Sequence, residues 1–147
     1  MPEVKYRYIT LEEACEIHRK TVDYSGGGLV QSRELGTLDG VLKNIQIDSY
    51  YPTIVDKLTH LFFCVCEFHC FADGNKRLAI TLCTQFLLLN GYLNIARDFI
   101  PKMENISYYV AAGKISKNLL HQIMESVMDG SFDENESLQL SILDAIK

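Results

Sequence analysis

The sequence has no surplus of basic residues. Lysine and arginine number 14 against 19 aspartate and glutamate residues, which gives a formal net charge of −5. A protein that binds nucleic acid through a broad surface must neutralise many phosphates and therefore needs a basic face. The charge balance argues against a nucleic-acid partner, and any function that depends on lysine or arginine must be confined to a local site.

A long hydrophobic run and a disulfide framework are also missing. The longest apolar stretch, residues 78–89, is interrupted by polar side chains. It has about half to two-thirds of the roughly 20 residues that a membrane span requires. The five cysteines are an odd number without framework-like spacing, and no charged segment followed by an apolar one opens the chain. We therefore expect a reduced, cytoplasmic protein without a membrane partner.

Strand-like alternation is scarce. Only Tyr6–Ile9 and Tyr92–Ile95 alternate as strands do, whereas apolar residues at helical spacing recur along most of the chain. At 147 residues, the chain is long enough to bury one core without disulfides or metal. The sequence therefore predicts an all-α domain of about six or seven helices, in which two central helices are wrapped by the others.

Local start and stop signals predict where these helices lie. Thr10 and Glu13 form a capping-box pattern at the start of the first helix. Thr37 can cap the second, and Pro52 fits the first turn of the third. The pair Asn90–Gly91 is typical of the end of a helix, here the fourth. The expected helices cover approximately residues 11–23, 38–46, 52–69, 75–89, 104–112, 117–128 and 138–146.

A short polar segment separates the two central helices. Residues 69–77 read HCFADGNKR. A helix N-terminus presents unpaired backbone N–H groups and the positive end of the helix dipole, and Gly74–Asn75 would let a phosphate approach them closely. Lys76 and Arg77 lie in the first turn, where the dipole disfavours cations unless an anion is bound there. The pattern predicts an anion site.

Two more residues of the segment extend this interpretation. Asp73 would repel a bare phosphate unless a divalent cation lies between them, which is how Mg²⁺ joins a carboxylate to nucleotide phosphates. His69 is the one group of the segment with an ordinary pKa near neutrality, so it can take a proton from a hydroxyl group. The residues therefore indicate a Mg-nucleotide site with a general base beside it.

Two other interpretations of the segment remain open. A polar connection between helices, in which His69 and Arg77 only cap helix ends, has the same composition. Cys66, His69 and Cys70 would also share one helix face, as zinc ligands can. Zinc sites usually have four ligands, however, and Cys64 would point about 160° away from Cys66 on a helix. Buried free cysteines are the simpler explanation.

The segment HCFADGNKR resembles the signature of the Fic/Doc (Fido) superfamily, His-Pro-Phe-x-(Asp/Glu)-Gly-Asn-(Gly/Lys)-Arg. Eight of the nine positions satisfy it, and Cys70 stands where proline is usual. The chain is similar to the short death-on-curing (Doc) toxin branch, also in the segment SGGGLVQSRELGTL and in the Asn90–Gly91 pair. This resemblance implies one Fido domain over residues 1–147, with a core at about 9–128 and an acidic linker and C-terminal helix at 131–147.

The resemblance implies a toxin of a toxin–antitoxin system that uses ATP and Mg²⁺. Its target would be a Ser, Thr or Tyr hydroxyl of a protein such as a translation elongation factor. His69 would act as the base and Asp73 would hold Mg²⁺. Gly74 and Asn75 would line the anion hole, and Arg77 would bind phosphates.

Lys76 is the residue on which the type of transfer depends. Family members that transfer AMP generally have glycine at this position, where the α-phosphate needs room. Lysine is typical of the Doc branch, in which the nucleotide is thought to bind reversed, with its γ-phosphoryl group facing the histidine. The resemblance therefore favours phosphorylation, with AMP or other nucleotidyl transfer and a catalytically silent binding domain as the alternatives.

A small antitoxin is the expected partner. Many family members carry an inhibitory helix with the pattern Ser/Thr-x-x-x-Glu-Gly/Asn. Residues 131–135 of this chain, SFDEN, are one residue short of that pattern. The resemblance therefore favours restraint by a second protein over restraint by the chain's own acidic C-terminal segment.

The remaining histidines and the glycine-rich segment have other expected roles. His18, His60 and His121 lie inside predicted helices without a legible catalytic grouping nearby, so we expect packing or surface roles. Gly26–Gly28 lacks the strand and helix context of a nucleotide fingerprint. We expect a mobile flap, with a possible short β-hairpin, that aligns a target segment by β-augmentation, or simply a long connection.

Overall fold

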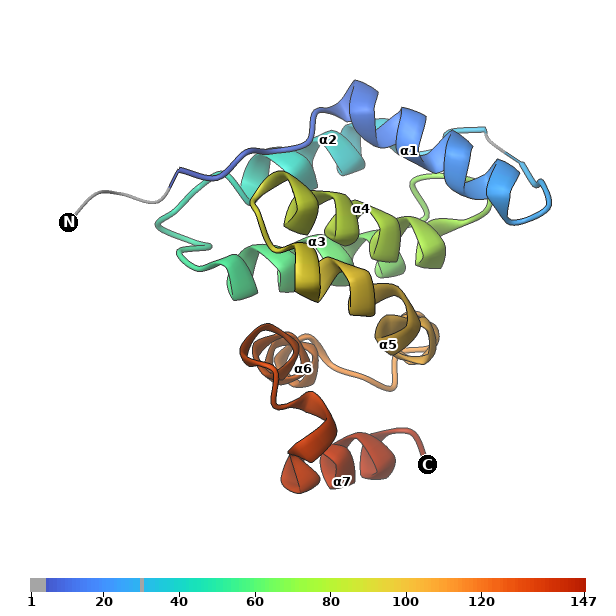
Figure 1. Ribbon diagram of the computed structural model, residues 1–147. Coiled ribbons are helices and arrows are strands. Elements are labelled where there is room, and N and C mark those ends of the chain that lie inside the picture. Colours follow the sequence, from blue (N-terminus) through green and yellow to red (C-terminus); the bar gives the residue numbers. More distant parts are fainter. Residues whose placement is uncertain (1–4, 30) are drawn as a thin grey trace.

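Helices make up most of the chain. The computed structural model describes residues 5–29 and 31–147, and these contain α-helices, one short 3₁₀ helix (η1) and no strand (Figure 1). The all-α prediction is therefore confirmed. The elements are α1 (Leu11–Tyr24), α2 (Leu35–Asn44), α3 (Ile54–Glu67), α4 (Asn75–Leu89), α5 (Leu93–Ala111), α6 (Lys117–Asp129), η1 (Phe132–Glu134) and α7 (Glu136–Ala145).

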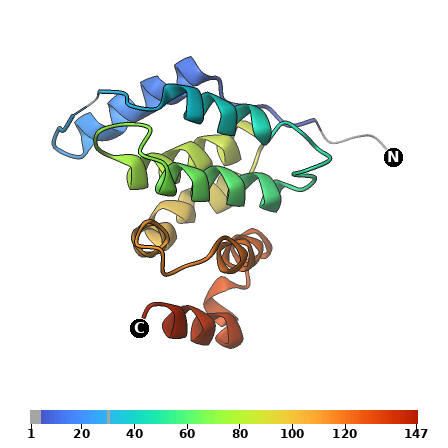
Figure 2. The same ribbon diagram turned by 180° about the vertical axis from the view of Figure 1, so that it is seen from behind.

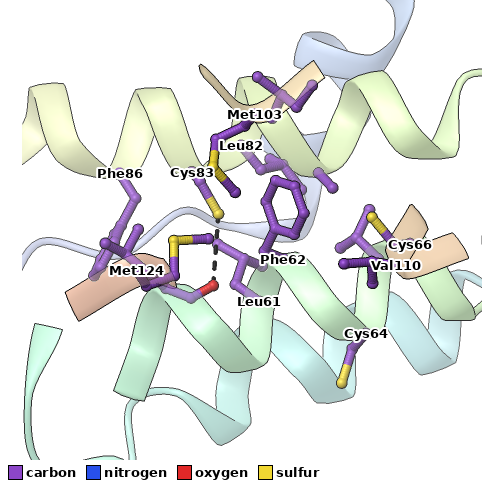
Figure 3. Close-up of a cluster of buried hydrophobic side chains, with 14 of the residues drawn as sticks. Leu61, Phe62, Cys64, Cys66, Leu82, Cys83, Phe86, Met103, Val110 and Met124 are labelled. Atoms are coloured by element: carbon purple, nitrogen blue, oxygen red, sulfur yellow. Dashed lines mark hydrogen bonds between the residues drawn. The ribbon is translucent and has the colours of Figure 1, made fainter. Parts of the chain in front are cut away.

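The helices α3 and α4 lie at the centre of the molecule. In both views α1 and α2 lie on one side of this pair, and α5, α6 and finally α7 lie on the other (Figures 1 and 2). Phe62 of α3, Leu82 of α4 and Met103 of α5 are fully buried and meet in the core (Figure 3). The connection between α3 and α4 reaches the surface beside the carboxyl end of α1, and it consists of the polar segment described above.

The third helix is shorter than predicted. Thr53 is its N-cap and shares a reciprocal capping box with Asp56, so Pro52 lies before the helix rather than in its first turn. This pair satisfies two end groups of the backbone, which fixes the start. At the other end the backbone of Phe68 is extended, and the helix stops at Glu67. His69 is therefore part of the connection between the helices.

The second helix begins earlier than Thr37. Its N-cap is Glu34, whose side chain makes no capping hydrogen bond. The backbone N–H of Glu34 instead donates to the carbonyl oxygen of Cys70 at 3.1 Å. A contact with a residue far along the chain therefore sets this helix start, and Thr37 lies inside the helix.

Neither predicted strand forms. The segment Tyr92–Ile95 belongs mostly to α5, which also continues through Pro101. Tyr6–Ile9 lies along the core without strand partners among the described residues, because the Asn90 side chain pairs with both backbone groups of Arg7. None of the described helices has the length and apolar character that a bilayer crossing requires.

A buried histidine joins α3 to α6. His60 is 8% exposed, and its Nδ1 atom accepts a hydrogen bond from Lys117 Nζ at 2.8 Å. Burial and the Lys117 charge both disfavour the imidazolium and lower the pKa of His60 from 6.5 to about 4. The expected packing role of His60 is confirmed, and the ring is held neutral.

We expect the buried His60 to make the protein less stable in weak acid. His60 takes up a proton below pH 6.5 in the unfolded chain, but only near pH 4 in the folded protein. Its contribution is therefore fully present above pH 6.5, and it falls by on the order of 3 kcal/mol as the pH drops from 6.5 to about 4. The difference between the free energies of unfolding at pH 7 and pH 4.5, obtained from urea unfolding, measures this loss. A His60→Gln variant should lack this part of the loss, and equal losses in both proteins would contradict the assignment.

Candidate active site

The connection between α3 and α4 is closed by the side chain of Asn75. Its Oδ1 atom accepts the backbone N–H of Phe71 at 3.1 Å, and its Nδ2 group donates to the Phe71 carbonyl oxygen at 2.9 Å. The amide of Asn75 is thus used within the loop. Its backbone N–H, at the first position of α4, is the group of this residue that lies at the open helix end. The predicted role of Asn75 in an anion hole can rest only on that backbone group.

The inner side of the loop rests on α1. Phe71 is buried, and its ring stacks on that of His18, with centroids 3.7 Å apart and an angle of 12° between the planes. His18 Nε2 lies 2.7 Å from the carbonyl oxygen of Asp73. The sequence indicated packing for His18, which is correct, but not its contact with the loop. Its place on the buried face of α1, four residues from both Ala14 and Val22, indicated a core residue but could not identify this contact.

The outer side of the loop is paired with the segment that precedes α2. Arg33 N–H donates to Cys70 O at 2.8 Å, Ala72 N–H donates to Gln31 O at 2.9 Å, and Ser32 and Phe71 form an isolated antiparallel bridge. The described residues of the predicted flap form this pairing rather than a hairpin; Val30 lies outside the described residues. The flap segment is therefore anchored on the loop by one of its edges, and the expected alignment of a target segment by β-augmentation stays a prediction.

Two pockets adjoin at Arg77. The smaller, of about 360 Å³, includes Asp73, Gly74 and Arg77 in its wall, together with the carboxyl end of α1 and two glycines of the flap segment. The larger, of about 710 Å³, is lined by Lys76 and Arg77 and by residues of α1 and α5. Asp73, Lys76 and Arg77 are exposed. Four of the predicted site residues therefore gather around two joined cavities at the start of α4.

His69 lies at the opposite end of the loop. It is exposed, directly after the extended Phe68, and it belongs to neither pocket wall. Solvent and a docked protein segment can therefore reach its ring. The predicted base therefore lies in the connection before α4, whereas Lys76 and Arg77 lie in the first turn of α4 and line the pockets.

The carboxylate of Asp73 faces the smaller pocket, and its Oδ2 atom accepts the backbone N–H of Leu29 at 3.1 Å. One carboxylate combined with phosphate oxygens is a typical Mg²⁺ site, so the residues present fit this metal when a nucleotide is bound. Within the described residues, no group of three His, Cys, Asp or Glu side chains converges on a possible metal position. The zinc interpretation is therefore wrong.

The cysteines of the loop region behave as apolar residues. Cys66 and Cys70 are buried, whereas His69 is exposed. Burial raises the pKa of Cys66 to about 12 and that of Cys70 to about 11. Both thiols therefore stay protonated near neutral pH, which disfavours metal binding and nucleophilic chemistry.

A family model described as the Fic/DOC family matches residues 8–87 of the chain. This protein belongs to the Fic/DOC family. The matched range contains α1 to α3, the loop and nearly all of α4, which are the elements that form both the loop and its supports. The resemblance seen in HCFADGNKR is therefore confirmed, and α5 to α7 lie beyond the range that the family model covers.

A curated Fic/DOC relative is also similar. The chain is 33% identical over 90 residues to a protein named Toxin Doc from Mycolicibacterium smegmatis (strain ATCC 700084 / mc(2)155), and this alignment covers 58% of the chain and 68% of the relative. No solved structure matches the chain.

Proposed function

We propose that this Fic/DOC protein is a Doc-like toxin that transfers the γ-phosphoryl group of Mg-ATP to a hydroxyl side chain of a target protein. The observation that carries the proposal is the grouping of Asp73, Gly74, Lys76 and Arg77 around two joined pockets at the open start of α4. The geometry offers a polar cavity for phosphates next to a larger cavity for the rest of a nucleotide.

The helix start supports phosphate binding. The first backbone hydrogen bond of α4 runs from Leu78 N–H to Gly74 O, so the N–H groups before Leu78 are not used within the helix. They carry the positive end of the helix dipole. Lys76 and Arg77 add two cationic side chains in the same turn, and arginine can grip two phosphate oxygens at once. Asp73 would hold Mg²⁺, which when bound neutralises phosphate charge.

The lining of the larger pocket fits a nucleoside bound beside Arg77. Its wall combines the apolar side chains Ile80 and Ile100 with the rings of Tyr24 and Tyr108. Flat aromatic bases bind well between such surfaces, and a few polar groups at one end orient them. Because Arg77 borders both pockets, a nucleotide in the larger one can extend its phosphates toward Asp73.

His69 is the proposed base. Its exposed ring can accept the proton of a target hydroxyl as the oxygen forms a bond to the γ-phosphorus and the bond to the bridging β–γ oxygen breaks. The leaving group is then ADP. The remaining work is orientation and charge neutralisation, which the helix start, Lys76 and Arg77 supply.

A small antitoxin is the proposed restraint, and a component of the translation machinery such as an elongation factor is the proposed target. The toxin name of the Mycolicibacterium relative supports the first of these. The location of the acidic C-terminal segment argues against self-inhibition. Its 3₁₀ helix η1 packs on α6, on the side of α3 and α4 away from α1, whereas both pockets are lined by α1 (Figures 1 and 2).

Labelled ATP tests which group is transferred. We expect a target protein incubated with the enzyme and Mg-ATP to take label from the γ-phosphate and none from the α-phosphate. Label from the α-phosphate alone would establish AMP transfer, and no label from either would establish a binding domain; each result would overturn the proposal. The second candidate is AMP transfer, because Arg77 borders both pockets and could bind the α-phosphate as well as the γ-phosphate.

Lys76 is expected to set the direction of the nucleotide. A Lys76→Gly variant should transfer the γ-phosphoryl group at least about tenfold more slowly, since a hydrogen bond to a charged group contributes on the order of 1.5–3 kcal/mol. The same label experiment measures this and shows whether label from the α-phosphate appears. Lys43, which pairs with Asp39 on α2 and lines neither of the two pockets, provides the control: Lys43→Gly should keep γ-transfer. Equal γ-transfer by Lys76→Gly and the parent would contradict the assignment.

A further inference from the structure

We propose that His18 is a positioning residue for the anion site, and that it acts by fixing the orientation of the peptide between Asp73 and Gly74. This inference rests on the proposed nucleotide binding at the start of α4. His18 itself lines neither pocket and touches no proposed reacting atom. Its effect passes through the backbone of the loop.

The contact defines the tautomer of His18. The ring is 1% exposed, and its Nε2 atom lies 2.7 Å from the Asp73 carbonyl oxygen. A carbonyl oxygen can only accept, so Nε2 must carry the hydrogen. The structure therefore requires a histidine that donates from Nε2, a more specific demand than filling space in the core.

The contact also defines where the next N–H points. The Asp73 carbonyl and the Gly74 N–H belong to one planar peptide unit, in which a trans bond directs them to opposite sides. With the carbonyl turned inward to the buried His18, the Gly74 N–H points away from α1. Gly74 precedes the first turn of α4, so this N–H joins the free donors of the helix start.

Neighbouring contacts hold His18 in this place. Its ring is stacked on Phe71, which the Asn75 amide fixes by both backbone groups. One turn further along α1, Thr21 Oγ1 lies within hydrogen-bonding distance of Thr81 Oγ1 of α4, at 3.1 Å. This contact sets the position of α1 along α4. The Nε2–H group of His18 therefore donates to a loop whose conformation is already fixed by the Asn75 side chain.

A reversal of this peptide would be possible without His18. Gly74 has a φ of +80°, in the region where glycine has the most freedom. A loop glycine of this kind permits the preceding peptide to turn over unless its carbonyl is held. If the peptide turned, its carbonyl oxygen would face a bound phosphate in place of the N–H and would repel it.

The tautomer can be tested in the unaltered protein. We expect the ¹⁵N spectrum of the histidine side chains to show His18 with a hydrogen on Nε2, both with and without Mg-ATP. Finding the hydrogen on Nδ1 alone would overturn the proposal. This measurement needs no variant and does not depend on catalysis.

Paired variants separate the donor from the ring. His18→Gln keeps a donor at the position of Nε2 but loses the ring, whereas His18→Phe keeps a ring on Phe71 but loses the donor. We expect His18→Phe to bind Mg-ATP about tenfold more weakly than the parent and His18→Gln to stay within about threefold. Calorimetry gives the affinities.

A second measurement follows the Gly74 N–H itself. The Gly74 amide resonance of ¹⁵N-glycine-labelled protein, assigned from its absence in Gly74→Ala, should move in ligand-free His18→Phe. His18→Leu replaces His18→Phe if the larger ring prevents folding.

The outcomes distinguish this inference from the proposed function. A parent protein that does not bind Mg-ATP overturns the proposed nucleotide site, and the role of His18 with it. A parent that binds, with variants that follow the donor, supports both. If the parent binds and His18→Phe binds equally well with an unmoved Gly74 resonance, only the role of His18 is overturned. Weak binding by both His18→Gln and His18→Phe would show that the ring, not the donor, matters, and would also overturn it.

Discussion

Replacing His69 with alanine should lower transfer to the target by about 100- to 10,000-fold, the range that a general base contributes. His69 is exposed and lies outside both pockets, so the variant should keep its fold and its affinity for Mg-ATP. The rate of γ-label transfer under single-turnover conditions measures the first effect, and calorimetry measures the second. A low rate with normal nucleotide affinity is the result expected of a base.

His121 supplies the matched control. It is a partly exposed histidine that lies on α6, away from the loop, and pairs with Asp56 Oδ1 at 2.9 Å. His121→Ala should cost some stability, because it removes one of the hydrogen bonds that lower the pKa of Asp56. Its transfer rate should equal that of the parent. If His69→Ala labels its target as fast as His121→Ala does, His69 is not the base.

Helix ends that depend on neighbouring residues were predictable from the sequence. Thr10 and Glu13 form the predicted capping box, and Ser116 caps α6 through its contact with Leu119 N–H. Both signals act within four residues, so no knowledge of the fold is needed. The start of α2 was not predictable in this way, because the N–H of Glu34 finds its partner at Cys70, in the loop before α4.

The site shows the same division. The grouping of acidic, glycine and basic residues at the start of α4 could be predicted because they lie within one short segment, and their role in phosphate binding stays a prediction. The role of His18 could not, because its contact with Asp73 joins residues 55 positions apart. A histidine on the buried face of an amphipathic helix carries no sequence signal that separates support of a loop from ordinary packing.

Gly74 should be the loop position least tolerant of a side chain. At its φ of +80° an added Cβ would lie 3.1 Å from Val22 Cγ2 and 3.4 Å from His18 Nε2. The left-handed backbone alone costs about 1–2 kcal/mol for a residue other than glycine. Relief of the crowding must in addition move the loop away from α1. A displacement of about 1 Å at a reacting centre can reduce a rate by about 100-fold, and we expect Gly74→Ala to lose transfer by this order.

Gly91 provides a control that distinguishes the effect of backbone strain from the effect of moving the loop away from α1. Its φ is +86°, nearly that of Gly74, but an added Cβ would meet nothing within 4 Å. Gly91→Ala should therefore lose about the same 1–2 kcal/mol of unfolding free energy from backbone strain while keeping nucleotide binding and transfer. Urea unfolding, calorimetry and label transfer on both variants give the comparison. Equal transfer by the two variants would mean that the contact between the loop and α1 does not govern the site. A loss confined to Gly74→Ala would locate the effect at the surface where His18 and Val22 support the loop.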